Sequence, residues 1–153
     1  MITMPENVKE IGDEAFEGCT NLKKINIPKG LMEINDLSFK GCKNLEEIII
    51  PKGIIRVGAE AFSGCEKIKK IIIPEGTESI GSGAFENCTQ LVDVYIPASV
   101  VSIDDSFICF GKVDEDDEWD WGGFGYLPIT IHAPKGSYAE NYALRCQTAF
   151  VEE

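Results

Sequence analysis

Basic residues are scarce in this chain of 153 residues. It has 14 lysines and arginines against 26 aspartates and glutamates, which gives a formal charge of −12. Such a chain would repel a phosphate backbone, and no basic face compensates for the repulsion. We therefore expect no nucleic-acid partner, whereas the charge favours solubility and cationic partners.

Long apolar runs are also absent. None approaches the roughly 20 residues that a helix needs to cross a bilayer, so we expect no insertion into a membrane. Residues 1–5 lack the charged and apolar regions of a signal peptide. The sequence leaves open whether the protein stays in the cytoplasm or has a signal outside this sequence.

The residues that usually support catalysis are missing as well. His132 is the only histidine, and no second base, nucleophile motif or metal-ligand cluster accompanies it. The chain contains no G-x-S-x-G, no phosphate-binding glycine loop and no H-E-x-x-H. We therefore expect a protein that is not an enzyme and needs neither a cofactor nor a metal ion.

Cysteine pairs with metal-ligand spacing do not occur either. Four of the six cysteines recur every 23 residues, without C-x-x-C pairs or neighbouring histidines. Stacked strands are about 4.8 Å apart, which exceeds the ~3.8 Å between the Cβ atoms of a disulfide. We expect buried free thiols at Cys19, Cys42, Cys65 and Cys88, while a bridge between Cys109 and Cys146 stays open.

What the sequence does have is a repeat of 23 residues, and we call each repeat a coil. Proline occupies Pro5, Pro28, Pro51, Pro74 and Pro97. Further columns at the same stride hold Phe16, Phe39, Phe62 and Phe85; Leu22, Leu45, Ile68 and Leu91; Ile25, Ile48, Ile71 and Val94. Such a period is the signature of stacked coils that share one core.

Each coil contains signals for one strand and several turns. The alternating pattern L-x-x-I-x-I-P predicts a short strand that proline ends, and strands of successive coils should pair in parallel. We expect positive φ in the column of Gly12, Asn35, Gly58, Gly81 and Asp104, and again at Gly18, Gly41, Gly64 and Asn87. Asp13, Asp36 and Ser82 are expected to cap a single helical turn that carries the phenylalanine.

The pattern I-P-x-x-V-x-x-I-G-x-x-A-F-x-G-C-x-x-L-x-x-I-x-I-P resembles the BspA-like class of leucine-rich repeats, over residues 2 to about 110. The segment 131–143 resembles the usual C-terminal ending of that family. The resemblance implies an α/β repeat fold: a right-handed solenoid of 23-residue coils with one parallel sheet, short helical turns on the opposite side and a C-terminal helix cap. It also implies a bacterial cell-surface or secreted setting with a role in adhesion.

The ends of the repeat suggest one domain over residues 1–153. Regular coils cover 2–110, an acidic and aromatic insertion covers 111–128, and the last strand and a C-terminal cap cover 129–153. Ser137-x-x-Glu140 is a capping-box pattern that predicts a short helix. No cap is visible before the first coil, so this end could continue a longer array or support self-association.

The outward face of the strands is our first candidate for a binding site, because solenoids commonly use it for ligands. Its central column is predicted to be Asn26, Ile49, Ile72, Tyr95 and Thr130, flanked by Lys24, Glu47, Lys70 and Asp93. Opposite charges on neighbouring strands should stabilise the sheet. The apolar stripe from Ile49 to Tyr95 is the type of patch that marks a contact site. We place His132 in the proline column.

The insertion offers an alternative site. Its acidic run from Asp114 to Asp120 could hold calcium, although it lacks the order of an EF-hand loop and a solvated loop explains it better. Its aromatic residues could pack back onto the solenoid or bind protein or sugar. The residues concerned are Trp119, Trp121, Phe124 and Tyr126.

We therefore expect a macromolecular-recognition module with a protein partner. The alternatives are glycan binding through Trp119, Trp121 and Tyr126, and a structural spacer within a longer surface protein. The sequence does not identify the partner, the compartment or the oligomeric state.

Overall fold

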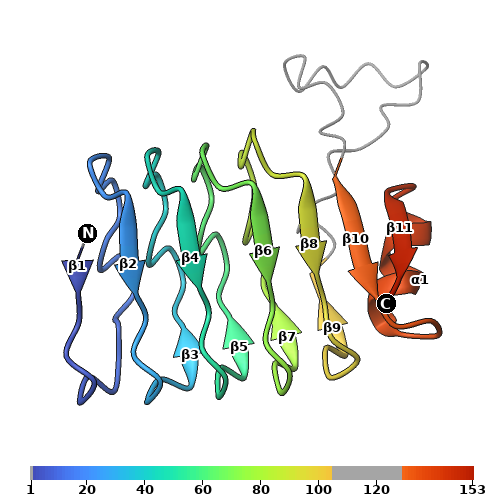
Figure 1. Ribbon diagram of the computed structural model, residues 1–153, viewed down its shortest axis with the longest axis horizontal. Coiled ribbons are helices and arrows are strands. Elements are labelled where there is room, and N and C mark those ends of the chain that lie inside the picture. Colours follow the sequence, from blue (N-terminus) through green and yellow to red (C-terminus); the bar gives the residue numbers. More distant parts are fainter. Residues whose placement is uncertain (1, 105–128) are drawn as a thin grey trace.

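A computed structural model describes residues 2–104 and 129–153. In these residues the chain forms a solenoid whose coils lie side by side along its long axis (Figure 1). One row of strands consists of β1 (Ile2–Thr3), β2 (Lys24–Asn26), β4 (Glu47–Ile49), β6 (Lys70–Ile72), β8 (Asp93–Tyr95), β10 (Thr130–Ala133) and β11 (Ala149–Glu152). All pairs within this row are parallel.

The predicted stride is visible in the register of these strands. Ile25 is the Cα partner of Ile48, and Ile71 is the partner of Val94. Residues 23 apart therefore neighbour one another, as the repeat predicted. The row has one interruption between β4 and β6, which belong to different sheets, and Ile48 is less buried there than Ile71 and Val94.

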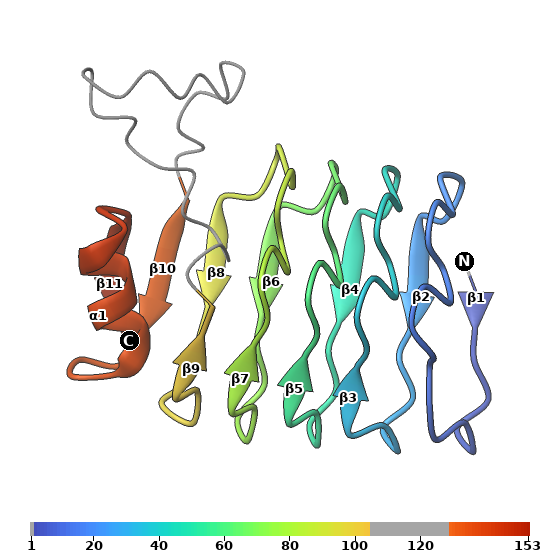
Figure 2. The ribbon, with the colours of Figure 1, turned by 180° about the vertical axis from the view of Figure 1, so that it is seen from behind.

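The expectation of a single sheet is wrong. A second parallel sheet of two-residue strands runs along the solenoid, and both views of the ribbon show it (Figures 1 and 2). Its strands are β3 (Glu33–Ile34), β5 (Arg56–Val57), β7 (Ser79–Ile80) and β9 (Ser102–Ile103). The buried column of Ile34, Val57, Ile80 and Ile103 lies on these strands, so each coil supplies core residues from two strands.

The expected helical turns are hydrogen-bonded turns instead, and in the described ranges α1 (Tyr138–Arg145) is the one helix. In the turns, Phe16 N–H donates to the carbonyl of Ser38 in the next coil, and Phe39 N–H donates to that of Ala61. The phenylalanine rings stack with centroids 5.3–5.4 Å apart, from Phe16 to Phe85. Bonds between coils thus alternate with bonds inside each turn, such as that from Cys19 N–H to the carbonyl of Phe16, and the turns do not continue into a helix.

The four cysteines in register are free thiols, as predicted. Three of them donate to the phenylalanine carbonyl of the preceding coil, over 3.1–3.2 Å from sulfur to oxygen. Burial raises the pKa of the Cys42 thiol to about 11 and that of Cys88 to about 12. Cysteine suits this column because it fills a small space and still offers a donor.

The glycines of the Gly12 column do not have positive φ, so this prediction is wrong. Positive φ occurs two residues later, at Glu14, Leu37, Glu60 and Gly83. A Cβ atom at Gly81 would lie 2.6 Å from the backbone nitrogen of Ala59. Glycine is therefore needed there because two coils approach closely. The second column was predicted correctly, since Gly18, Gly41, Gly64 and Asn87 all have positive φ.

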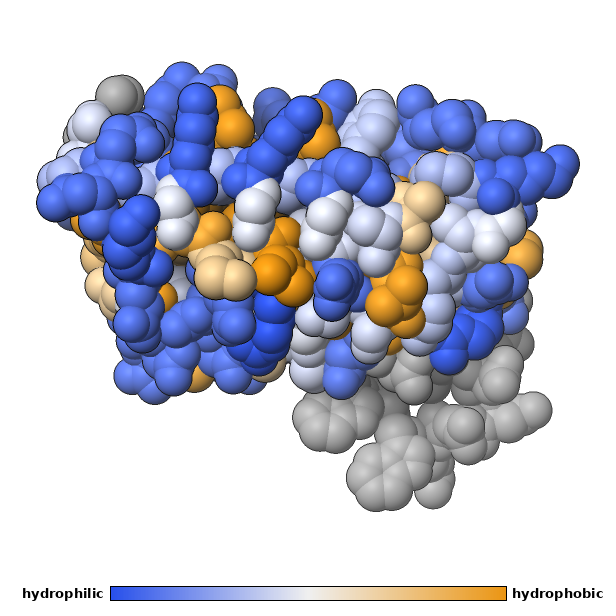
Figure 3. Space-filling view, turned by 90° about the horizontal axis from the view of Figure 1, so that it is seen from below, coloured by the Kyte–Doolittle hydropathy of each residue, from blue (hydrophilic) through white to orange (hydrophobic). Residues whose placement is uncertain are grey.

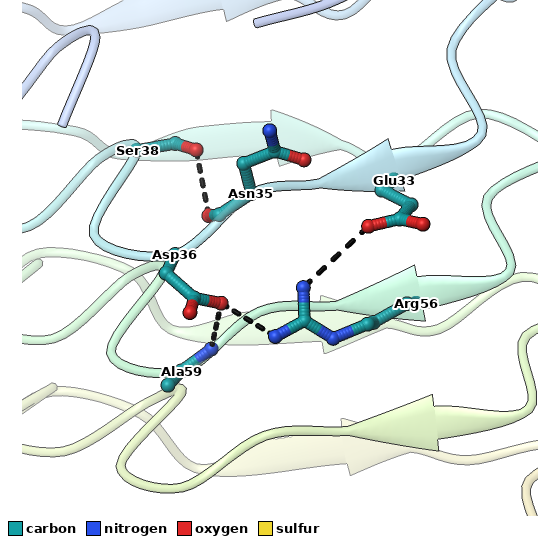
Figure 4. Close-up of polar contacts among 6 residues, drawn as sticks. All are labelled: Glu33, Asn35, Asp36, Ser38, Arg56 and Ala59. Atoms are coloured by element: carbon teal, nitrogen blue, oxygen red, sulfur yellow. Dashed lines mark hydrogen bonds and ion pairs between the residues drawn. The ribbon is translucent and has the colours of Figure 1, made fainter. Parts of the chain in front are cut away.

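Asp36 links two coils rather than capping a helical turn, which corrects another prediction. Its Oδ1 accepts from the backbone N–H of Ala59 over 2.9 Å and from Nη2 of Arg56 over 2.6 Å (Figure 4). The carboxylate raises the pKa of the Arg56 guanidinium above its ordinary value. Coil-to-coil bonding therefore outcompetes local capping at this position.

The C-terminal end has the predicted helix. Ser137 is its N-cap and accepts a hydrogen bond from the backbone N–H of Glu140. Helix α1 lies beside β10 and β11 at this end of the solenoid (Figure 2). It contacts β9, β10 and β11, and its Tyr142 is completely buried. Among the described residues, no helix combines the length and apolar character required to cross a bilayer.

Candidate functional site

The outward face of the strand row carries the candidate site. Asn26 and Ile49 are Cα partners, as are Ile72 and Tyr95. The predicted positions of the central column are therefore confirmed on β2, β4, β6 and β8. The side chain of Ile49 is 80% exposed and that of Ile72 is 56% exposed. Two large apolar side chains in successive coils thus face solvent at the centre of the face.

Thr130 does not belong to this central column, and His132 takes its place. Thr130 pairs with Asp93, whereas His132 is the Cα partner of Tyr95. The predicted register was therefore two residues out after the insertion, and His132 is not in the proline column. Pro134 lies two residues after His132, as Pro97 lies two after Tyr95, and that spacing was the signal in the sequence.

His132 organises the C-terminal part of the face. Its ring stacks on that of Tyr95, with the centroids 4.2 Å apart. Its Nε2 lies 2.8 Å from Oδ1 of Asp93, and its Nδ1 lies 3.2 Å from Oε1 of Glu153. The imidazole is thus held between two carboxylates and an aromatic ring, which makes it a structural element of the face.

The charged residues beside the central column were expected to pair across neighbouring strands, and only one of the two pairs forms. Lys24 Nζ lies 2.8 Å from Glu47 Oε2, and this carboxylate raises the pKa of Lys24. Lys70, in contrast, lies over the ring of Tyr95, 4.1 Å from its centroid, while Asp93 binds His132. Both faces of the Tyr95 ring are therefore occupied, so this ring offers no free surface for stacking.

The side-chain amide of Asn26 is hydrogen-bonded to the backbone of Met4 in the preceding coil. Its Oδ1 accepts from the backbone N–H of Met4 over 2.7 Å, and its Nδ2 donates to the carbonyl of Met4 over 3.2 Å. The side-chain amide thereby extends the pairing between β1 and β2 by one residue. This end of the array has partly buried Phe16 and Cys19 and an exposed Ile2; self-association through it stays a prediction.

A groove of about 530 Å³ lies along β2 and β4 and the turns that follow them. Ile25, Ile27, Ile49 and Pro51 line it together with the charged residues Glu6, Lys24, Lys29, Glu47 and Lys52. Lys29 and Lys52 were not predicted as site residues because they lie in turns outside the alternating strand pattern. Their shared position after a proline of the repeat was the available signal.

Other exposed apolar side chains lie outside the strand row. Met32, Ile55 and Val101 are 62%, 37% and 65% exposed, and Glu78 interrupts their column. Seen from below, apolar side chains alternate with hydrophilic ones and do not form one continuous patch (Figure 3). Among the described residues, exposed apolar side chains thus occur at several places, and those of the strand row, Ile49 and Ile72, lie in the column that was predicted to bind.

The alternative site of the insertion lies outside the described residues. This concerns Trp119, Trp121 and Tyr126, the acidic run 114–120 and Cys109, so the question of a bridge between Cys109 and Cys146 stays open. Within residues 2–104 and 129–153, no group of three or more histidine, cysteine or acidic side chains is arranged to hold a metal ion.

Residues 1–112 match a family described as BspA type leucine rich repeat region, in 6 copies. A leucine rich cell surface protein from Faecalibacterium prausnitzii is 33% identical, with a TM-score of 0.67, covering 69% of this chain and 28% of that one. A leucine-rich repeat protein from Bacteroides ovatus is 28% identical, with a TM-score of 0.56, covering 68% of this chain and 37% of that one.

The pneumococcal vaccine antigen PcpA shares the fold, with a TM-score of 0.68 at 18% identity over 99% of this chain and 41% of PcpA. The chain therefore spans less than half the length of each of these three structures. No curated protein matches the chain.

Proposed function

The chain belongs to the BspA-type leucine-rich-repeat family, and from this membership we propose that it is a non-enzymatic module that binds another protein through the outward face of β2, β4, β6 and β8. Modules of this kind typically serve protein interaction or adhesion. We further propose a cell-surface or secreted setting, which the similarity to a bacterial cell surface protein supports.

The exposure of Ile49 and Ile72 is the observation that carries the proposal. Fully burying an exposed large aliphatic side chain contributes roughly 1.5–3 kcal/mol, and the folded monomer forgoes most of this contribution at Ile49 and part of it at Ile72. Charged side chains surround the pair, as in an interface with an apolar centre and a polar rim. A protein partner suits this arrangement because it can cover both side chains at once.

Surface plasmon resonance on a panel of immobilised host matrix proteins, including collagen, laminin, fibrinogen and fibronectin, tests the proposal. We expect the wild-type chain to bind at least one of them, and Ile72→Glu to weaken that binding at least tenfold. Leu144→Glu is the matched control, because Leu144 is 67% exposed on α1, away from the strand face. All three proteins should give the same circular-dichroism spectrum.

Equal binding by Ile72→Glu and Leu144→Glu would exclude the strand face as the contact surface. Failure of the wild-type chain to bind any member of the panel would count against adhesion to host matrix.

A further inference from the structure

The groove along β2 and β4 combines an apolar lining with lysines. Ile25, Ile27, Ile49 and Pro51 supply the apolar part. Lys29 and Lys52 project from equivalent turns, and in the described residues no carboxylate lies within ion-pair distance of either ammonium group. Since Glu47 already neutralises Lys24, Glu6 is the one lining carboxylate left to offset these two cations.

The wider strand face differs from the rest of the molecule in its charge. From β2 to β8, its outward columns and the turns that follow hold six of the 14 basic residues: Lys23, Lys24, Lys29, Lys52, Lys69 and Lys70. They hold four of the 26 acidic residues, Glu46, Glu47, Glu75 and Asp93, and Glu6 lies beside them in the turn after β1. A chain with a net charge of −12 thus presents one face with a small positive excess, beside its exposed isoleucines.

We infer that this groove binds an acidic segment of the protein partner, in extended conformation, with a carboxylate at Lys29 and Lys52 and an apolar side chain against Ile49. The inference rests on the proposed function, because the groove is part of the same face. Charge complementarity selects the partner: the free lysines attract carboxylates, whereas the acidic remainder of the protein repels a long polyanion such as nucleic acid. The groove follows two parallel strands, which suits an extended peptide.

Panning a phage-displayed library of linear twelve-residue peptides on the immobilised full chain tests this inference. We expect the enriched peptides to combine aspartate or glutamate with a neighbouring large apolar residue. An enriched peptide labelled with fluorescein is then titrated with the protein and followed by fluorescence anisotropy. Its affinity should fall on raising sodium chloride from about 50 to about 300 mM, because exposed charges are screened.

The variants locate the binding site. We expect Lys29→Glu/Lys52→Glu to weaken binding of the labelled peptide at least tenfold. Lys67→Glu/Lys135→Glu is the matched control, since it makes the same change of charge at exposed lysines outside the groove and should change the affinity less than twofold.

Enriched peptides without acidic residues, no enrichment at all, or equal loss in both double variants would each overturn the inference. If matrix-protein binding still depended on Ile72 in that case, the proposed function would stand and only the acidic character of the partner would be wrong. If, in addition, binding to the matrix proteins did not depend on Ile72, the strand face would be excluded as a binding site.

Discussion

The ring of Tyr95 lies nearly parallel to the imidazole of His132, at an angle of 8° and a centroid distance of 4.2 Å. This contact joins β8 to β10, which pair in one sheet although β9 and the insertion lie between them in sequence. The imidazole also lies within hydrogen-bond distance of the carboxylates of Asp93 and Glu153. One side chain thus connects β8, β10 and the residue that follows β11.

We predict that His132→Ala lowers the free energy of unfolding by about 1–2 kcal/mol, from the lost stacking and hydrogen bonds. Urea denaturation measures the change. His132→Phe keeps a ring on Tyr95 and should recover part of the loss, while Leu144→Ala on the exposed side of α1 should have little effect. A loss of equal size in His132→Ala and Leu144→Ala would contradict a structural role of the imidazole.

Gly81 and Gly12 occupy the same column but should respond differently to alanine. A Cβ atom at Gly81 would lie 2.6 Å from the backbone nitrogen of Ala59 and 2.8 Å from the carbonyl carbon of Gly58, both in the preceding coil. Nothing lies within 4 Å of a Cβ atom at Gly12. We predict that Gly81→Ala destabilises the fold by about 1–3 kcal/mol through overpacking, while Gly12→Ala leaves stability unchanged or slightly higher.

Thermal denaturation of the two alanine variants decides this prediction. A lower melting temperature for the Gly12 variant than for the Gly81 variant would show that close approach of the coils does not explain the glycines.

The buried thiols should make stability depend on alkaline pH. The pKa of Cys42 is about 11 in the folded chain, against an ordinary value of 9.0. Between these two values the unfolded state gives up a proton that the folded state keeps, so stability falls as the pH rises, by at most about 1.4 kcal/mol per pH unit for each such thiol. Urea denaturation under reducing conditions at about pH 8 and about pH 10, on either side of the ordinary thiol pKa, measures the decline.

The double variant Cys42→Ser/Cys88→Ser is the control for this effect, because serine does not ionise in this range. Its stability should fall less between the two pH values than that of the wild-type chain. Identical declines would assign the pH dependence to other groups.

The carboxylate of Asp36 should matter more than that of Glu33, although both approach Arg56. Asp36 also accepts from the backbone of Ala59, whereas Glu33 Oε2 lies 3.5 Å from Arg56 Nη1 and has no second partner in Figure 4. We expect Asp36→Ala to cost about 1–2 kcal/mol because it removes the hydrogen bonds to the Ala59 N–H and to Arg56 at a half-buried position, and Glu33→Ala to cost less than about 1 kcal/mol. Chemical denaturation of both variants checks the order, and equal costs would contradict it.

The core was predictable from the sequence because its columns recur without a slip. Ile25, Ile71 and Val94 were assigned to the core by their stride alone, and the structure places them there. The second sheet was not predicted, because strands of two residues are too short to show an alternating pattern.

The candidate site was predictable only where the stride continues. Ile49, Ile72 and Tyr95 follow it, whereas His132 comes after the insertion, and the residues between do not preserve the count. The role of Asn26 also depends on a contact with Met4 that no spacing indicates. Periodicity thus predicts the column in which a residue lies, but not the residue that its side chain contacts.

The backbone bonds between the phenylalanine turns all point the same way. Glu14, Phe16 and Gly18 donate to the next coil, and the corresponding residues of later coils repeat this direction. Their peptide dipoles therefore add along the solenoid axis, as they do along a helix. This flank of the molecule acquires an electrical polarity, with partial negative charge toward its first coil and partial positive charge toward its later ones.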